Sequence, residues 1–311
     1  MHLVFPGAVP VHANHADTAE IRKINDRATE FYYQGYYDSS RMLATKANKM
    51  ANQLLSAGDE NYAQAYTDML KVHKARALDI LALSIESAQP QEAVDSLKAA
   101  LKLMEETGNI TELANLHSSM ANIYDFQAQN QLALEHHNTS IKLFREADNL
   151  KGLAMALTNI GITYRNMGNF GEAMEVLLES LALFRNLNDS VNAVETLLAM
   201  GFVYMYVNKW DDALEAQKQA LEIYRSLNDS LGIARIYNDM GAVNMSAGNY
   251  EEALQQHKAA LKIRLNSNEY YYTFASYFYI ATIHEKFEQF DDALDHYQSA
   301  LRYAERIGSR I

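Results

Sequence analysis

Residues 161–181 read GITYRNMGNFGEAMEVLLESL, and the same pattern of small and aromatic residues returns 40 positions later. Residues 201–221 read GFVYMYVNKWDDALEAQKQAL, and residues 241–261 read GAVNMSAGNYEEALQQHKAAL. An alanine marks each copy, and its six positions stand 40 residues apart: Ala93, Ala133, Ala173, Ala213, Ala253 and Ala293. A fixed period of this length indicates a repeat architecture, in which each unit buries its apolar face against its neighbours.

Each repeat is predicted to form two antiparallel helices. Apolar and small residues recur at steps of three and four, which places them on one face of a helix. Gly168 and Gly248 stand in the middle of their repeats, where a glycine takes the left-handed conformation that ends a helix. Between repeats, residues 188–190 and 228–230 read NDS and supply side-chain oxygens for the amides of the next helix. Small residues such as Gly201 are expected where two helices approach closely.

The order of these residues resembles the tetratricopeptide repeat (TPR), a helix–turn–helix whose usual length is about 34 residues. In the fourth repeat the resemblance rests on Gly161, Tyr164, Gly168, Phe170 and Ala173. The longer period of 40 residues is similar to the arrays of kinesin light chains, LGN-type regulators and bacterial signalling proteins. The resemblance implies an all-α fold, a right-handed α-α superhelix of about seven helix-turn-helix repeats.

The resemblance also divides the chain into segments. We expect a flexible N-terminal arm over residues 1–20, a divergent first repeat over 21–60 and a helical extension over 61–73. Six repeats of 40 residues then fill residues 74–311 and start near residues 74, 114, 154, 194, 234 and 274. In the second repeat, this spacing puts Leu81 at the small position and Ser84 at the aromatic position.

Composition and motifs exclude several classes of function. The net charge is −12, from 27 Lys and Arg against 39 Asp and Glu, so phosphate backbones and anionic lipid are repelled. There is no cysteine, so thiolate chemistry and Cys-ligated metals are excluded. No nucleotide-binding loop, nucleophile elbow or H-E-x-x-H motif is present, and the adjacent His136 and His137 point in different directions on a helix. We therefore predict a non-catalytic protein without cofactor or metal, with no nucleic acid partner and no membrane insertion.

A partner-binding groove is implied by the resemblance, because the first helices of tetratricopeptide arrays line a concave surface. Positions counted back from the marker alanines fall on one helix face. Asparagine amides on this face can hydrogen-bond a peptide backbone, and methionines adapt to apolar anchors. The alternative is that the asparagines are ordinary surface residues and the apolar side chains pack between helices. The predicted groove residues are Asn115, Ser118, Asn122, Asp125, Thr158, Arg165, Asn166, Phe202, Met205, Tyr206, Arg235, Asn238, Met245 and Phe278.

The leading hypothesis is a scaffold that binds a peptide or protein segment within a signalling or regulatory assembly. One alternative is the sensor part of a longer signalling protein that carries a kinase, cyclase or transcription-regulating domain. Another is a structural solenoid that associates with itself through an uncapped C-terminal end. The partner and the oligomeric state are not readable from the sequence. The absence of cysteine suits the cytosol and an export route equally, so the location stays unknown, with the cytoplasm slightly favoured over a periplasmic or exported location.

Overall fold

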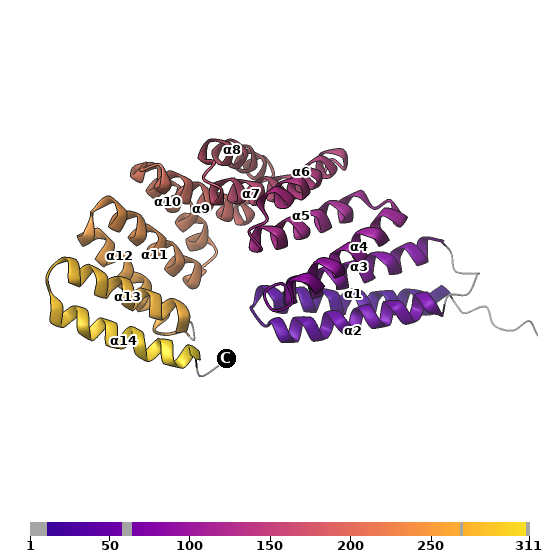
Figure 1. Ribbon diagram of the computed structural model, residues 1–311, viewed down its shortest axis with the longest axis horizontal. Coiled ribbons are helices and arrows are strands. Elements are labelled where there is room, and N and C mark those ends of the chain that lie inside the picture. The colour runs from indigo at the N-terminus through magenta and orange to yellow at the C-terminus, as the bar shows by residue number, and fades with distance from the viewer. Residues whose placement is uncertain (1–10, 58–63, 268–269, 309–311) are drawn as a thin grey trace, which may run out of the picture. The chain divides into compact units, whose positions relative to one another are not determined.

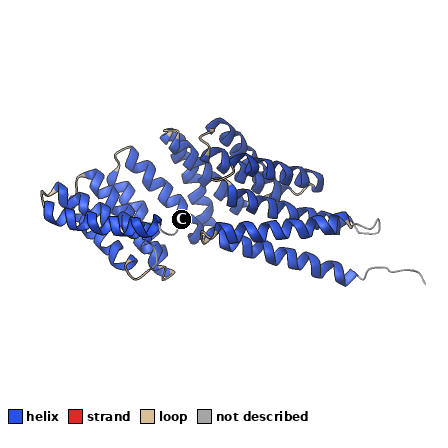
Figure 2. Ribbon diagram, turned by 60° about the horizontal axis from the view of Figure 1, so that its bottom comes forward, coloured by secondary structure: helices blue, strands red, loops and turns tan. Residues whose placement is uncertain are grey.

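The chain folds into paired helices. A computed structural model describes residues 11–57, 64–267 and 270–308, and within these ranges every regular element is an α-helix (Figure 2). Fourteen helices follow one another there, and consecutive helices pack against each other from α1 to α6 and from α8 to α14 (Figure 1). The helices are α1 (Val11–Tyr33), α2 (Tyr37–Ser56), α3 (Gln64–Ile85), α4 (Pro90–Thr107), α5 (Ile110–Phe126), α6 (Asn130–Glu146), α7 (Leu150–Asn166), α8 (Phe170–Asn186), α9 (Ser190–Tyr206), α10 (Trp210–Ser226), α11 (Ser230–Ala247), α12 (Tyr250–Arg264), α13 (Tyr270–Lys286) and α14 (Phe290–Gly308). The predicted all-α helical repeat is confirmed.

Two compact units make up the chain, Met1–Thr163 and Tyr164–Ile311. Here they are called the N-terminal unit and the C-terminal unit. The odd-numbered helices are the first helices of their repeats, and the even-numbered helices are the second. From α5 onward, each first helix begins four residues before the predicted start of its repeat. The helix boundaries therefore follow the capping residues between repeats and not the marker alanines.

The turns repeat with the same period as the helices. In six of the seven repeats, one residue of the turn between the two helices has positive φ: Gly35, Ala128, Gly168, Asn208, Gly248 and Glu288; the four-residue α3–α4 turn has none. Between repeats, the corresponding residues are Gly108, Asp148, Asn188 and Asn228. The left-handed conformation predicted for Gly168 and Gly248 is confirmed, with φ of 81° and 83°. The backbone thus adopts this conformation in the turn of every repeat except the second, whichever residue stands there.

The predicted N-caps are also confirmed. The Asp189 side chain accepts a hydrogen bond from the Asn192 amide at 3.2 Å, and Asp229 accepts one from the Gly232 amide at 2.9 Å. Asn149 makes the same contact with the amide of Gly152 at 2.9 Å. Each cap satisfies one of the free amides that a helix leaves at its N-terminus.

Ala128 has a left-handed backbone with φ of 55°. Its side chain has neither the small size of glycine nor the local hydrogen bonds of asparagine and aspartate, which favour this conformation. We expect Ala128→Gly to stabilise the N-terminal unit by about 0.5–1 kcal/mol, because glycine takes this conformation without steric strain. Ala99→Gly on the exposed face of α4 is the matched control, and it is expected to destabilise by a similar amount. Urea midpoints that move in the same direction for both variants would contradict this explanation.

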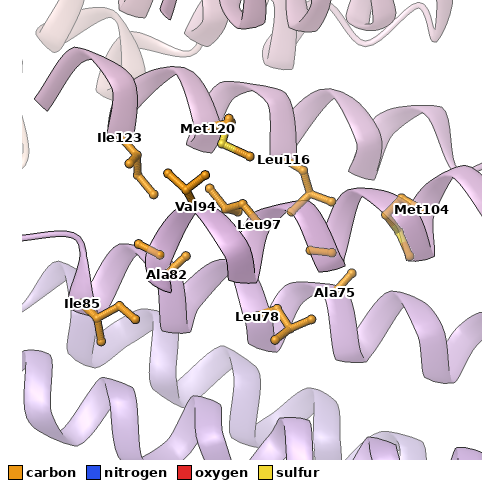
Figure 3. Close-up of a cluster of buried hydrophobic side chains, with 12 residues drawn as sticks. Ala75, Leu78, Ala82, Ile85, Val94, Leu97, Met104, Leu116, Met120 and Ile123 are labelled. Carbon is orange, nitrogen blue, oxygen red and sulfur yellow. The ribbon is translucent and has the colours of Figure 1, made fainter. Parts of the chain in front are cut away.

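A hydrophobic core joins three consecutive helices of the N-terminal unit. Figure 3 shows Ala75, Leu78 and Ala82 of α3 close to Leu97 of α4 and Met120 of α5, and all of these residues are buried. In this core, α3 packs on α4, the second helix of its own repeat, and α5 packs on α4 of the preceding repeat. Because each joint is filled in this way, a repeat is stable only with its neighbours.

The second repeat departs from the predicted register by one residue. Its α3–α4 turn has four residues, 86–89, whereas the α5–α6 turn has three, 127–129. As a result, buried residues of α3 correspond to those of α5 at a spacing of 41, with Ala75 matching Leu116 and Ala82 matching Ile123. The assignment of Leu81 and Ser84 to the small and aromatic positions is therefore wrong.

The N-terminal boundary also differs from the prediction. Helix α1 begins at Val11, so residues 11–20 are helical and do not belong to a flexible arm. The helix extends this far because Thr18 and Ile21 lie on its buried face, and Ile21 packs with Tyr66 and Leu70 of α3. Residues 1–10 of the predicted arm and residues 61–63 of the predicted extension lie outside the described residues, and α3 runs through the rest of that extension.

Candidate functional site

The predicted groove residues fall into three classes of exposure. Those exposed to solvent are Asn115, Asn122, Asn166, Tyr206, Arg235 and Phe278. Those that are half-buried are Ser118, Asp125, Arg165, Phe202, Met205 and Met245. Thr158 and Asn238 are buried, with Asn238 only 9% exposed. The first helices thus present most of these residues on an accessible face. Thr158 and Asn238 point into the packing between repeats, whereas Phe278, at the same position of the last repeat, is exposed.

In the C-terminal unit, residues of successive repeats meet on this face. Arg235 of α11 donates two hydrogen bonds to Glu195 of α9, with N–O distances of 2.7 and 3.2 Å. The guanidinium of Arg165 lies over the ring of Phe202, 5.4 Å from its centre. Burial lowers the pKa of Arg165 from its usual value. We call the surface formed by Arg165, Glu195, Phe202, Met205, Tyr206, Arg235 and Met245 the first-helix face of this unit.

Tyr206 is the most accessible aromatic residue of the first-helix face. Its ring stacks on Phe170 of α8, with centres 5.4 Å apart, and one side remains open to solvent. Phe170 was not among the predicted groove positions, whereas Glu195 falls on one of them, 18 residues before the marker Ala213. A signal for Glu195 was available in the sequence, because Glu195 and Arg235 have opposite charges and are one period apart.

The N-terminal unit presents a more polar first-helix face. Asn115 and Asn122 of α5 are exposed there. Asp125 is half-buried, and its Oδ2 accepts hydrogen bonds from His137 Nε2 at 3.1 Å and from Thr163 Oγ1 at 2.5 Å. These bonds give Asp125 a structural role, since its carboxylate joins α5, α6 and α7.

A histidine pair was missed from the sequence. His117 of α5 and His136 of α6 place their Nδ1 atoms 2.8 Å apart, so one proton is shared between two half-buried rings. Burial, and then the neighbouring His136, lowers the pKa of His117 to about 4, and burial also lowers the pKa of His136. The two rings are therefore neutral at physiological pH, and His136 contacts His117 while His137 contacts Asp125.

Asn238 belongs to a buried polar network between the last two repeats. Its Oδ1 accepts a hydrogen bond from His257 Nδ1 at 3.0 Å and lies 3.3 Å from Ser276 Oγ. Ser276 in turn accepts a hydrogen bond from Arg264, a buried cation that also donates to the Tyr272 carbonyl. The placement of Asn238 in an exposed groove is therefore corrected: this side chain connects α11, α12 and α13.

Removal of this amide should destabilise the C-terminal unit. We expect Asn238→Ala to lower its stability by about 1–3 kcal/mol, because His257 and Ser276 lose a buried acceptor. Asn122→Ala removes the same group from an exposed position, so its effect should stay within about 0.5 kcal/mol. Thermal denaturation of both variants measures the difference, and equal melting temperatures would show that the network contributes no stability.

Two further features of the described residues concern metal ions and membranes. No cluster of three or more His, Asp or Glu side chains suited to a metal ion was found among them. In the same residues, no helix has the length and apolar composition needed to cross a membrane.

Comparisons with known proteins place the fold. The sequence model of the tetratricopeptide repeat family matches residues 152–226 and 232–306. BtubC (BKLC) from P. vanneervenii is 19% identical, with 75% of this chain and 92% of that chain covered and a TM-score of 0.64. The apo form of RapI is 16% identical, with 92% and 77% covered and a TM-score of 0.67. A Rap protein complexed with Competence and Sporulation Factor is 18% identical, with 93% and 77% covered and a TM-score of 0.61.

A comparison with curated protein sequences found no match. At the low identities of the structural neighbours, the likeness shows the fold alone. The family match begins in α7 and ends in α14, and the same helix pairs with the same left-handed turns continue in the repeats before it. The fold is that of a protein-interaction scaffold, and the chain is a tetratricopeptide-repeat protein.

Proposed function

We propose that this protein is a non-catalytic scaffold that binds a peptide or protein segment on its first-helix face, within a signalling or regulatory assembly. The observation that carries the proposal is the combination of groups on this face in the C-terminal unit. An open aromatic ring, two half-buried methionines and a bidentate ion pair lie on successive first helices. Aromatic and methionine side chains provide apolar anchoring, while the ion pair can exchange partners with charged groups of a ligand.

A structural neighbour supports the proposal. The Rap protein is complexed with Competence and Sporulation Factor, so a chain of this fold carries a bound partner there. The predicted groove residues that remain accessible here are the ones to test. Tyr206 and Arg235 lie in the C-terminal unit and Asn122 lies in the N-terminal unit, and all three side chains are exposed. Their replacement removes contacts for a ligand without opening the core.

The experiment is a selection of binding peptides from a displayed random library, followed by affinity measurement on two triple variants. In the first variant, Asn122, Tyr206 and Arg235 are changed to Ala. In the matched control, exposed residues of second helices are changed to Ala: Glu135, Leu178 and Lys218. We expect the first variant to lose the selected peptides and the control to keep them. Equal binding by both variants would reject the first-helix face as the binding surface.

A second candidate function, self-association, is favoured by the last helix. Leu301 of α14 is 59% exposed, whereas Leu261, at the same position one repeat earlier, is 8% exposed because α13 covers it. Phe290 and Leu294 lie on the same exposed stripe of α14. The first half of the helix carries Asp291, Asp292 and Asp295, and the second half carries Arg302 and Arg306 with one acidic residue, Glu305. Antiparallel pairing of two copies would bring opposite charges together along an apolar seam.

Sedimentation at increasing concentration tests this candidate. The mass of the parent protein should rise with concentration, and Leu301→Glu should keep it monomeric. Leu178→Glu on α8 is the control, since Leu178 is exposed to a similar degree. If the parent stays monomeric, or if both variants dissociate it equally, self-association through α14 is rejected.

A further inference from the structure

The first turn of the chain carries an unusual concentration of aromatic residues. Residues 31–37 read FYYQGYY and connect α1 to α2. The Tyr32 ring contacts those of Tyr33 and Tyr37, with centres 5.5 and 5.6 Å away. Tyr33 is 80% exposed and Tyr37 is 55% exposed. We call Tyr32, Tyr33, Tyr36 and Tyr37 the tyrosine cluster.

Later repeats show what normally covers a ring at this position. Tyr37 is the first residue of α2, as Phe170 is of α8 and Tyr250 is of α12. In the C-terminal unit, an aromatic residue from the following repeat packs on both of these rings, whereas the following repeat offers Ser246 and Ala247 to Trp210, the first residue of α10. Tyr206 stacks on Phe170 at 5.4 Å, and Phe287 meets Tyr250 edge-on at 6.3 Å.

At the first joint this covering ring is missing. The following repeat carries Ser84, Ile85 and Ser87 at the end of α3 and in the longer α3–α4 turn. A hollow of about 440 Å³ lies there, between this turn and the residues Tyr36 and Tyr37. The hollow has room for a planar group against the Tyr37 ring, in the place that an aromatic ring fills at later joints.

The charges around the hollow favour a cation. Asp38 and Arg41 neutralise each other, with an N–O distance of 2.9 Å. Glu86, in the longer turn, is half-buried and makes no hydrogen bond or ion pair with any described residue. It lies close to Tyr32: burial, and then the charge of Glu86, raises the pKa of the Tyr32 hydroxyl to about 12. Glu86 itself does not line the hollow, but it stands in the chain between Ile85 and Ser87, which do, so one uncompensated carboxylate is adjacent to the open aromatic faces.

A guanidinium group already stacks on a ring of the same turn. The Arg27 guanidinium lies 4.5 Å from the centre of the Phe31 ring, while it pairs with Glu30. Arginine combines a positive charge with a flat group that stacks on aromatic faces, and lysine lacks the flat group. We propose that the tyrosine cluster and Glu86 bind an arginine side chain of a basic partner segment, with its guanidinium stacked on Tyr37 and paired with Glu86.

The probe for this site is the acetylated and amidated peptide Gly-Arg-Gly-Arg-Gly, titrated by calorimetry into the full chain. Counterpart peptides carry Lys or Gln in place of Arg. We expect Arg to bind more tightly than Lys and the Gln peptide not to bind. Tyr37→Leu and Glu86→Gln should each weaken Arg binding by about threefold or more, whereas Tyr37→Phe should keep it because the ring remains.

General attraction to an acidic protein is controlled by Glu135→Gln, which removes the same charge from an exposed site on α6. This variant should bind the Arg peptide like the parent. Equal weakening by Glu86→Gln and Glu135→Gln, or equal binding of the Arg and Lys peptides, would overturn the proposal. Melting temperatures of the Tyr37 and Glu86 variants check that both are folded. The residues of this site are separate from the first-helix face, so the two proposals stand or fall independently.

Discussion

Replacement of Gly152 by alanine is expected to destabilise the N-terminal unit by about 1–3 kcal/mol. A Cβ atom at this position of α7 would lie 2.4 Å from the Phe144 ring of α6, well inside van der Waals contact. Phe144 is buried and cannot swing away from the clash without opening the core. In a helix, Gly→Ala normally stabilises by up to about 1 kcal/mol, so a net loss would measure the steric conflict alone.

Gly201→Ala is the matched control, because the environment of this glycine is different. Its added Cβ would lie 3.5 Å from Gln217 Cγ, an ordinary contact, so alanine should be neutral or slightly stabilising. The close approach expected at Gly201 from its place in the repeat is instead found at Gly241, where a Cβ would come within 2.6 Å of His257. Urea denaturation compares the two variants, and a loss of stability at Gly201 equal to that at Gly152 would refute the steric explanation.

Asp79→Asn is expected to stabilise the N-terminal unit at alkaline pH. Asp79 of α3 occupies the place that Met120 has in α5, because the longer turn shifts the register of α3 by one residue. Its Oδ1 is buried without a hydrogen-bond partner, although Ser119 bonds the carboxyl group. Burial, opposed by the hydrogen bond from Ser119 and aided by the charge of Glu112, raises the pKa of Asp79 to about 7.

The direction of the pH dependence follows from this shift. Between about pH 4 and pH 7, the folded protein binds more protons at Asp79 than the unfolded chain does. Stability therefore falls as the pH rises through this window and is lowest above pH 7. A shift of about three pKa units corresponds to at most about 4 kcal/mol. Asparagine has the same shape and no charge, so Asp79→Asn should gain a few kcal/mol at pH 8 and almost nothing at pH 4.

Urea denaturation at pH 4, 6 and 8 tests this expectation as a difference between variant and parent. The comparison cancels the opposite effect of His117, whose lowered pKa removes stability as the pH falls below about 6.5. Asp95→Asn on the exposed face of α4 should show no pH-dependent difference. A constant difference for Asp79→Asn across the three pH values would mean that Asp79 is not titrating in the folded protein.

Much of this fold could be predicted from the sequence, because the same packing and capping requirements recur in each repeat. Ala93 and its counterparts stand 40 residues apart, since each second helix needs a small residue at the same point of close packing. The turn glycines and the aspartate caps obey local rules that involve only a few neighbouring residues. These features predicted the helix pairs, the turns and the caps.

The candidate site was harder to predict from the sequence, because the exposure of a side chain depends on residues that are close in space but not along the chain. Asn115 and Asn122 are exposed as predicted, but Asn238 has a partner from the following repeat, Ser276, and turns inward. The pairing of His117 with His136 also joins two helices, and the spacing of these residues along the chain does not predict the contact.

The sequence by itself therefore determined the period, the helix pairs and the family of this protein, because periodicity and capping are local properties of the chain. The tertiary structure decided which members of a repeated position are accessible. One additional residue in the α3–α4 turn rotates α3 and buries Asp79 at an apolar position. The same turn leaves Tyr37 without the covering ring that later repeats supply. Such outcomes depend on the volume and charge that neighbouring repeats bring to each joint, and a single repeat does not contain that information.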